Sequence, residues 1–154
     1  MELNQKLKGF VQHGVRFTGK ENEQTVGVCP FCYKNKHFMV EDETSALLWH
    51  CHSCGEGGNF FQFLEKRALI YQDDLKGKAL NNLCKDRKLS SAVFKAFNVG
   101  WTGEFYSIPC TGNALNGNVT INIIRYIPGG KAVATSSSKL SFIVPFRMYN
   151  SETV

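Results

Sequence analysis

Short apolar stretches separated by polar turns mark the first 51 residues of the chain. Residues 15–18 and 25–28 flank a polar turn at 19–23, and residues 37–41 and 47–51 flank a second polar turn at 42–45. Strand-like stretches on both sides of a polar turn predict β-hairpins. We therefore expect two hairpins, one before each of two cysteine pairs described below.

The pattern changes to a helical period after residue 59. Phe60, Phe63 and Leu64 stand at i, i+3 and i+4, and Asn59 is a favourable N-cap, so the sequence predicts a helix over residues 60–70. Polar residues then interrupt the apolar pattern, and we place a linker at 71–78. Strand-like stretches follow at 105–108, 119–127, 131–135 and 142–146. The expected fold class is α+β, with one domain over residues 1–70 and a second small α+β region over 79–154.

The size, polarity and charge of the chain narrow its class. It has 154 residues, enough for one domain or two small ones, and no apolar run reaches the ~18 residues of a membrane helix. No signal peptide opens it, so we expect a cytoplasmic protein, or one in the host cytoplasm if it is viral. Residues 1–66 carry 7 basic and 8 acidic side chains, whereas residues 67–154 carry 11 and 5. The second half is therefore the better candidate to contact a polyanion.

Four of the six cysteines follow the spacing C-x2-C-x18-C-x2-C, namely Cys29, Cys32, Cys51 and Cys54. Two thiolates three positions apart can bind one ion, and two such knuckles complete a tetrahedral shell, so the spacing predicts zinc. The alternative is a disulfide framework, which a chain without an export signal disfavours. Four thiolates leave no open position for water, so the single zinc is expected to be structural. The two cysteines outside the pattern are interpreted as small core residues.

The residues around these knuckles resemble a known family. C-P-F-C at 29–32, L-W-H-C-H-S-C-G-E-G-G-N at 48–59 and F-F-Q-F-L at 60–64 closely resemble the zinc-binding domain that opens bacterial and phage DNA primases. Cys32 stands where the bacterial form has histidine, as in phage helicase–primases, and Trp49 stands where the family usually has phenylalanine. The resemblance implies a zinc ribbon and favours a phage or mobile-element origin. More weakly, residues 87–101 and 117–126 are similar to the start of the primase polymerase domain.

The catalytic part of the resembled family is missing from this sequence. That family transfers nucleotides in a Toprim fold, where a glutamate and an Asp-x-Asp pair hold divalent metal. After residue 86 the only acidic residues are Glu104 and Glu152. Two-metal phosphoryl transfer needs clustered carboxylates, so we do not expect this chain to polymerise alone. We expect it to be the N-terminal part of a longer primase or an accessory subunit, with the catalytic core supplied in cis or in trans.

The resemblance implies that the ribbon recognises a single-stranded DNA template. Such strands bind to aromatic side chains on which bases stack and to cations that follow the phosphates. The candidate contacts are aromatic, basic or imidazole side chains, in the ribbon Tyr33, Lys34, Lys36, His37, Phe38, Trp49 and His52, and in the second half Lys85, Arg87, Lys88 and Arg125.

Each candidate also has a plainer interpretation. Phe38 and Trp49 are equally suited to the ribbon core, the lysines to a solvated turn, and His50 and His52 to the surface. The alternative function is a zinc ribbon that docks on a polymerase or helicase without binding nucleic acid.

Overall fold

The computed structural model describes residues 4–114 and 117–136 of the chain. Helices and antiparallel sheets are both present, which confirms the α+β fold class. Of the described residues, 4–63 with Ser136 form one compact unit and 64–135 form a second.

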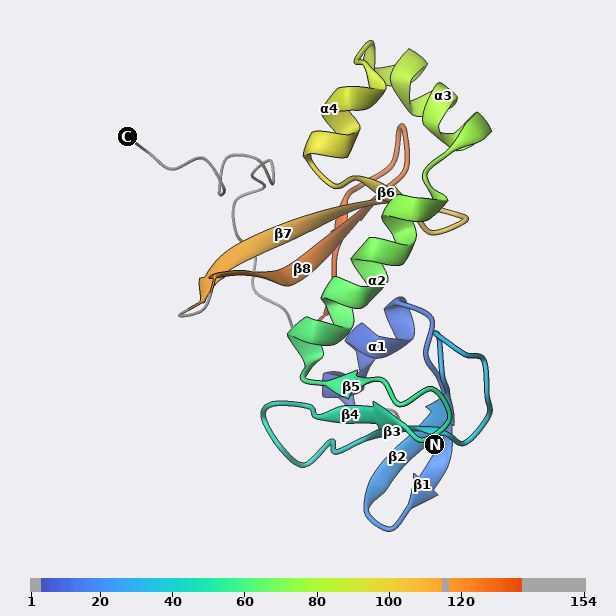
Figure 1. Ribbon diagram of the computed structural model, residues 1–154, viewed down its shortest axis with the longest axis vertical. Coiled ribbons are helices and arrows are strands. Elements are labelled where there is room, and N and C mark those ends of the chain that lie inside the picture. The colour runs from blue at the N-terminus through green and yellow to red at the C-terminus, as the bar shows by residue number, and fades with distance from the viewer. Residues whose placement is uncertain (1–3, 115–116, 137–154) are drawn as a thin grey trace. The chain divides into compact units, whose positions relative to one another are not determined.

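The first unit is built on one antiparallel sheet. A 3₁₀ turn η1 (Gln5–Leu7) and helix α1 (Lys8–Gln12) precede the strands β1 (Arg16–Glu21), β2 (Gln24–Val28), β3 (Phe38–Val40), β4 (Trp49–Cys51) and β5 (Gly57–Gly58). These strands lie side by side in chain order (Figure 1). Each strand is antiparallel to the next, so both predicted hairpins are confirmed.

The first hairpin turn is tighter than the sequence pattern predicted. β1 continues to Glu21 and pairs there with Gln24, which leaves only Asn22 and Glu23 in the turn. Both residues have positive φ, +46° and +66°. Two consecutive positive φ values are typical of the turn that matches the right-handed twist of two short strands.

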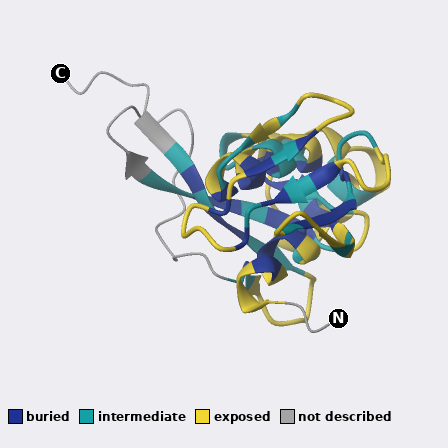
Figure 2. Cartoon of the chain, turned by 90° about the horizontal axis from the view of Figure 1, so that it is seen from below, coloured by how far each residue is buried: buried dark blue, intermediate teal, exposed yellow. Residues whose placement is uncertain are grey.

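Aromatic rings form the core of the first unit. Phe10, Phe38 and Phe63 are fully buried, and the Phe63 ring lies 4.6 Å from Phe10 and 6.0 Å from Phe38, centroid to centroid. Trp49 stacks on Phe38 at 5.3 Å and meets Phe63 edge-on at 5.7 Å. The buried stretches of these elements are dark blue in Figure 2. This small sheet therefore depends on aromatic packing from α1, which precedes it in the sequence, and from α2 (Phe60–Asp74), which follows it.

Helix α2 (Phe60–Asp74) begins where the sequence predicted. The Gln62 N–H donates to the Asn59 side-chain oxygen and the Asn59 N–H donates to the Gln62 side-chain oxygen, both at 2.9 Å. This reciprocal pair is a capping box, which satisfies two N–H groups that a helix start leaves open. The helix continues four residues beyond the predicted end at residue 70. The domain limits and the 71–78 linker stay predictions.

The second unit combines short helices with a second antiparallel sheet. α3 (Gly77–Arg87) and α4 (Ser91–Ala96) follow the end of α2, and β6 (Gly100–Trp101), β7 (Tyr106–Ala114), β8 (Gly117–Tyr126) and β9 (Val133–Ala134) pair in that order. The strands predicted within 105–135 are thus present, and the one predicted at 142–146 lies outside the described residues. Leu83, Phe94, Val99 and Tyr106 form a buried cluster.

Candidate metal centre

The four predicted ligands come together at one end of the first sheet. Cys29 follows β2 and Cys51 ends β4, while Cys32 and Cys54 stand in the turn after each. Their sulfur atoms all lie within 4.8 Å of one another. The Sγ atoms of Cys29 and Cys54 are 3.9 Å apart, and those of Cys32 and Cys51 are 3.6 Å apart.

These distances fit a tetrahedral zinc shell. Zinc bound to sulfur at about 2.3 Å requires sulfur–sulfur edges of about 3.8 Å. The two separations bracket that value, and disulfide-bonded sulfurs would lie at about 2.05 Å. The prediction of one structural zinc is confirmed: four thiolates fill the shell, so zinc here supplies folding energy rather than a reactive water.

The two knuckles have the same backbone closure. In the first, the Tyr33 N–H donates to the Cys29 carbonyl, and in the second the Gly55 N–H donates to the Cys51 carbonyl, both at 2.9 Å. The closing residue has a left-handed φ in each case, +61° at Tyr33 and +74° at Gly55. Glycine adopts this conformation without strain, whereas tyrosine does not. The first knuckle therefore retains a side chain at the position where the second has none.

The environment of the thiols differs between the ligands. Burial raises the pKa of Cys29, while a backbone hydrogen bond from Lys34 lowers the pKa of Cys32 to about 7. A bound zinc ion deprotonates its thiol ligands, so zinc binding must overcome the raised pKa of Cys29. Acidic conditions should accordingly release zinc from the site.

The aromatic core contacts the metal centre directly. Phe31, between the two ligands of the first knuckle, lies 5.5 Å from Trp49 and 5.9 Å from Phe63, centroid to centroid. The Trp49 indole N–H donates to the Asn59 carbonyl at 2.9 Å and so ties β4 to the start of α2. Zinc binding and packing of the core are therefore coupled.

Two of the predicted DNA contacts lie in this core. Phe38 is 0% and Trp49 is 2% exposed, so neither ring offers a face to a nucleobase, and the structure favours their plainer interpretation. The remaining ribbon candidates are exposed around the knuckles: Tyr33, Lys34, Lys36, His37 and His52. Of these, Tyr33 is 79% exposed.

His50, which sequence reasoning left among the surface residues, has a close partner. Its Nε2 lies 3.0 Å from Nε2 of His52, with the rings edge to face at 4.3 Å. Burial lowers the pKa of His50, and the neighbouring His52 lowers it further. The signal in the sequence was the H-x-H spacing at the end of a strand, because extended backbone places side chains two apart on one face.

The basic candidates of the second unit differ in their surroundings. Lys85, Arg87 and Lys88 are exposed at the C-terminal end of α3. The Arg87 guanidinium donates to the Tyr126 hydroxyl and lies 4.6 Å above that ring. Arg125 is half-buried and lies 5.5 Å above the Phe105 ring. The two lysines are thus the candidates whose charges extend most fully into solvent.

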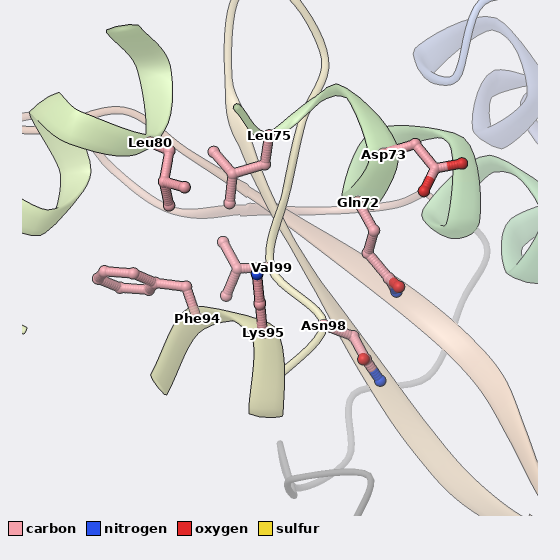
Figure 3. Close-up of a pocket in the computed structure, with 8 residues that line it drawn as sticks. All are labelled: Gln72, Asp73, Leu75, Leu80, Phe94, Lys95, Asn98 and Val99. Atoms are coloured by element: carbon pink, nitrogen blue, oxygen red, sulfur yellow. The ribbon is translucent and has the colours of Figure 1, made fainter. Parts of the chain in front are cut away.

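The second unit contains a cavity of about 260 Å³ with one apolar end and one polar end. Leu75, Leu80, Phe94 and Val99 point toward one another at the apolar end, while the amides of Gln72 and Asn98 lie at the other (Figure 3). Asp73 is the one carboxylate among the residues that line this cavity. A two-metal site requires several carboxylates, and this cavity does not offer them.

Among the described residues, no helix is long and apolar enough to cross a bilayer.

Comparison with known proteins extends the sequence resemblance. A family model described as CHC2 zinc finger, the DnaG-type zinc ribbon, matches residues 2–99. The match covers the whole ribbon and continues through α2, α3 and α4, and it ends just before β6. The similarity of later residues to a polymerase core stays a prediction. The comparisons with curated proteins and with solved structures gave no match.

Proposed function

The chain belongs to the CHC2 zinc-finger family of DnaG-type zinc ribbons, and on that premise we propose that it recognises single-stranded DNA template for primer synthesis. In this proposal the chain acts as the N-terminal part or an accessory subunit of a DNA primase. The zinc shapes two knuckles whose exposed side chains contact the bases.

The exposure of Tyr33 beside the zinc site is the observation that supports the proposal. Its ring is 79% exposed beside the zinc ligand Cys32, and its backbone is in the left-handed region at φ +61°. A non-glycine residue in that region costs about 1–2 kcal/mol, and such strain is concentrated at functional sites. Lys34 and Lys36 follow it, and both are exposed. An exposed ring beside cations is the combination with which proteins bind single strands.

The ribbon and the rest of the chain differ in net charge, which suggests different roles in DNA binding. Residues 1–66 have a net charge of −1, and four thiolates with Zn²⁺ add −2. A negative unit gains little from counterion release, so ribbon contacts should be local, weak and selective. The residues after 66 carry a net +6 and are better suited to follow the phosphate backbone, with Lys85 and Lys88 exposed at the C-terminal end of α3.

The chemistry of primer synthesis would come from a partner in this proposal. The carboxylates that hold catalytic metal belong to a primase core, joined to this chain in cis or bound in trans. In the docking alternative the partner is a polymerase or a helicase, so both functions require a partner protein and differ in whether the ribbon contacts DNA. The net negative ribbon is the observation that favours docking.

Titration of the zinc-loaded chain with labelled single-stranded DNA tests the proposal. Oligonucleotides of several base compositions are measured at two salt concentrations by fluorescence anisotropy. We expect affinities that differ between compositions and that weaken as salt rises. Binding that is equal for all compositions would assign the contacts to the basic second half, and absence of binding would favour the docking function.

A further inference from the structure

The outer face of β3 and β4 carries a group of histidines. Met39 pairs with His50 across the two strands, and the His52 N–H donates to the His37 carbonyl at 3.0 Å. His37 directly precedes β3 and His52 directly follows β4, and their backbone hydrogen bond extends the strand pairing by one position. By strand alternation, His37, His50 and His52 lie on the side opposite the buried Phe38 and Cys51. This face is not the one that contributes the zinc ligand Cys51.

Two of these imidazoles converge. The Nε2 atoms of His50 and His52 are 3.0 Å apart, with the ring planes at 87°. His52 is exposed and His50 is half-buried, so the pair is accessible to solvent. Glu41 adds a negative charge that acts on His50.

The distance between the two Nε2 atoms can be compared with the distances between nitrogen ligands of one metal ion. Two imidazole nitrogens that bind one metal at about 2.0–2.1 Å are about 2.8–3.0 Å apart when they are cis at 90°, and about 3.3–3.4 Å apart in a tetrahedron. The observed 3.0 Å, which is also the length of an N–H···N hydrogen bond between the two rings, fits the right-angled arrangement. Tetragonal geometry with nitrogen ligands is typical of Cu²⁺ and Ni²⁺.

We propose that His50 and His52 form a second metal site, an exchangeable two-imidazole chelate for a tetragonal divalent cation of the Cu²⁺ or Ni²⁺ class. Both nitrogens come from one strand and the turn that follows it, so the chelate forms within a single segment. Two protein ligands leave the remaining positions to water or to an external donor. The site is distinct from the zinc centre in its ligand atoms, and it stands whether or not the chain binds DNA.

Nickel titration of the zinc-loaded, tag-free full chain tests the site. Ni²⁺ uptake is followed by isothermal titration calorimetry, while a chromophoric chelator reports any zinc released. His50→Gln and His52→Gln each remove one nitrogen ligand and leave the cysteines intact. His37→Gln is the matched control, because His37 is an exposed histidine on the same face.

The expected result is uptake of one Ni²⁺ per chain without zinc release. Each of the two ligand variants should weaken nickel binding at least about tenfold, since even changes around the ligands cost 10–100-fold. His37→Gln should bind nickel as the native chain does. If His50→Gln disturbs the strand, His52→Gln still tests the site, because the His52 side chain is exposed and its replacement should not disturb packing.

Three results would overturn the proposal. Nickel uptake with equivalent zinc release would show that the thiolates are the ligands. Unchanged affinity in His52→Gln would show that the imidazole pair is not the site. The absence of uptake by the native chain would show that the pair is only a hydrogen-bonded contact.

Discussion

Replacement of Tyr33 by glycine should change stability and DNA binding in opposite directions. Tyr33 closes the first knuckle at φ +61°, and Gly55 closes the second at φ +74° through the same hydrogen bond. A left-handed φ costs a side-chain-bearing residue about 1–2 kcal/mol, while glycine loses about 0.5–1 kcal/mol more backbone entropy on folding. The difference predicts that Tyr33→Gly gains up to about 1.5 kcal/mol in stability.

The same substitution removes the proposed stacking surface. Because Tyr33 is 79% exposed, its ring adds little to the core but is available to a nucleobase. Stacking of one base on an aromatic side chain is worth about 1–3 kcal/mol. The affinity for single-stranded DNA should therefore fall roughly 5- to 150-fold.

Thermal unfolding of the zinc-loaded chain measures the first effect, and fluorescence anisotropy with labelled single-stranded DNA measures the second. Tyr33→Phe is the control, since it keeps both the ring and the strained backbone and should match the native chain in each assay. Unchanged DNA affinity in Tyr33→Gly would refute the stacking role. A loss of stability beyond about 1 kcal/mol in that variant would refute the strain argument.

Three further predictions concern the core, the metal and the charges. Phe63→Ala should lower the free energy of unfolding by about 3–5 kcal/mol and, because folding and zinc binding are coupled, weaken zinc binding about 10²- to 10⁴-fold in a chelator competition. Phe61 is 39% exposed, so Phe61→Ala should leave zinc binding unchanged. Equal zinc affinities in the two variants would show that core packing and metal binding are not coupled. Cys54→Ser should lose zinc and the cooperative unfolding transition of the ribbon, as metal analysis and calorimetry would show; a variant that keeps one zinc per chain contradicts the ligand set. Replacing the exposed basic residues Lys85, Arg87 and Lys88, at the C-terminal end of α3, by alanine together should flatten the salt dependence of DNA binding. An unchanged slope would mean that none of these charges contacts phosphate.

Local chemistry explains what could be predicted from the sequence. The two C-x2-C knuckles impose their own geometry, so spacing alone was enough to predict a zinc site whose sulfurs lie within 4.8 Å. The start of α2 was predictable for a similar reason, since Asn59 and Gln62 satisfy the first N–H groups without help from distant residues. Each knuckle and the helix start depend on residues close together in sequence.

Features set by packing could not be read in the same way. Phe38 and Trp49 were equally plausible as core or as stacking surface, because a strand pattern does not say which face becomes covered. Phe10, far away in sequence, lies 5.9 Å from Phe38, and α2 brings Phe63 to 5.7 Å from Trp49. Only these long-range contacts show that the rings are buried.

The end of α2 illustrates a second limit. Gln72 and Asp73 appeared as the start of a linker because polar residues interrupted the apolar pattern there. In the structure the helix continues through Asp74, and Tyr71 is buried. Polarity alone does not end a helix, since glutamine and aspartate are tolerated in a helix far better than glycine or proline, and neither of those occurs between Phe60 and Asp74.

The central claim is that the zinc knuckles contact single-stranded DNA, and mapping that contact by NMR tests it most directly. The zinc-loaded, ¹⁵N-labelled chain is titrated with the oligonucleotide that binds best, and the amide shifts are followed residue by residue. We expect shifts concentrated at Tyr33, Lys34, Lys36, His37 and His52, with a second group at the end of α3. Saturable binding that leaves the knuckle amides unshifted would contradict that claim.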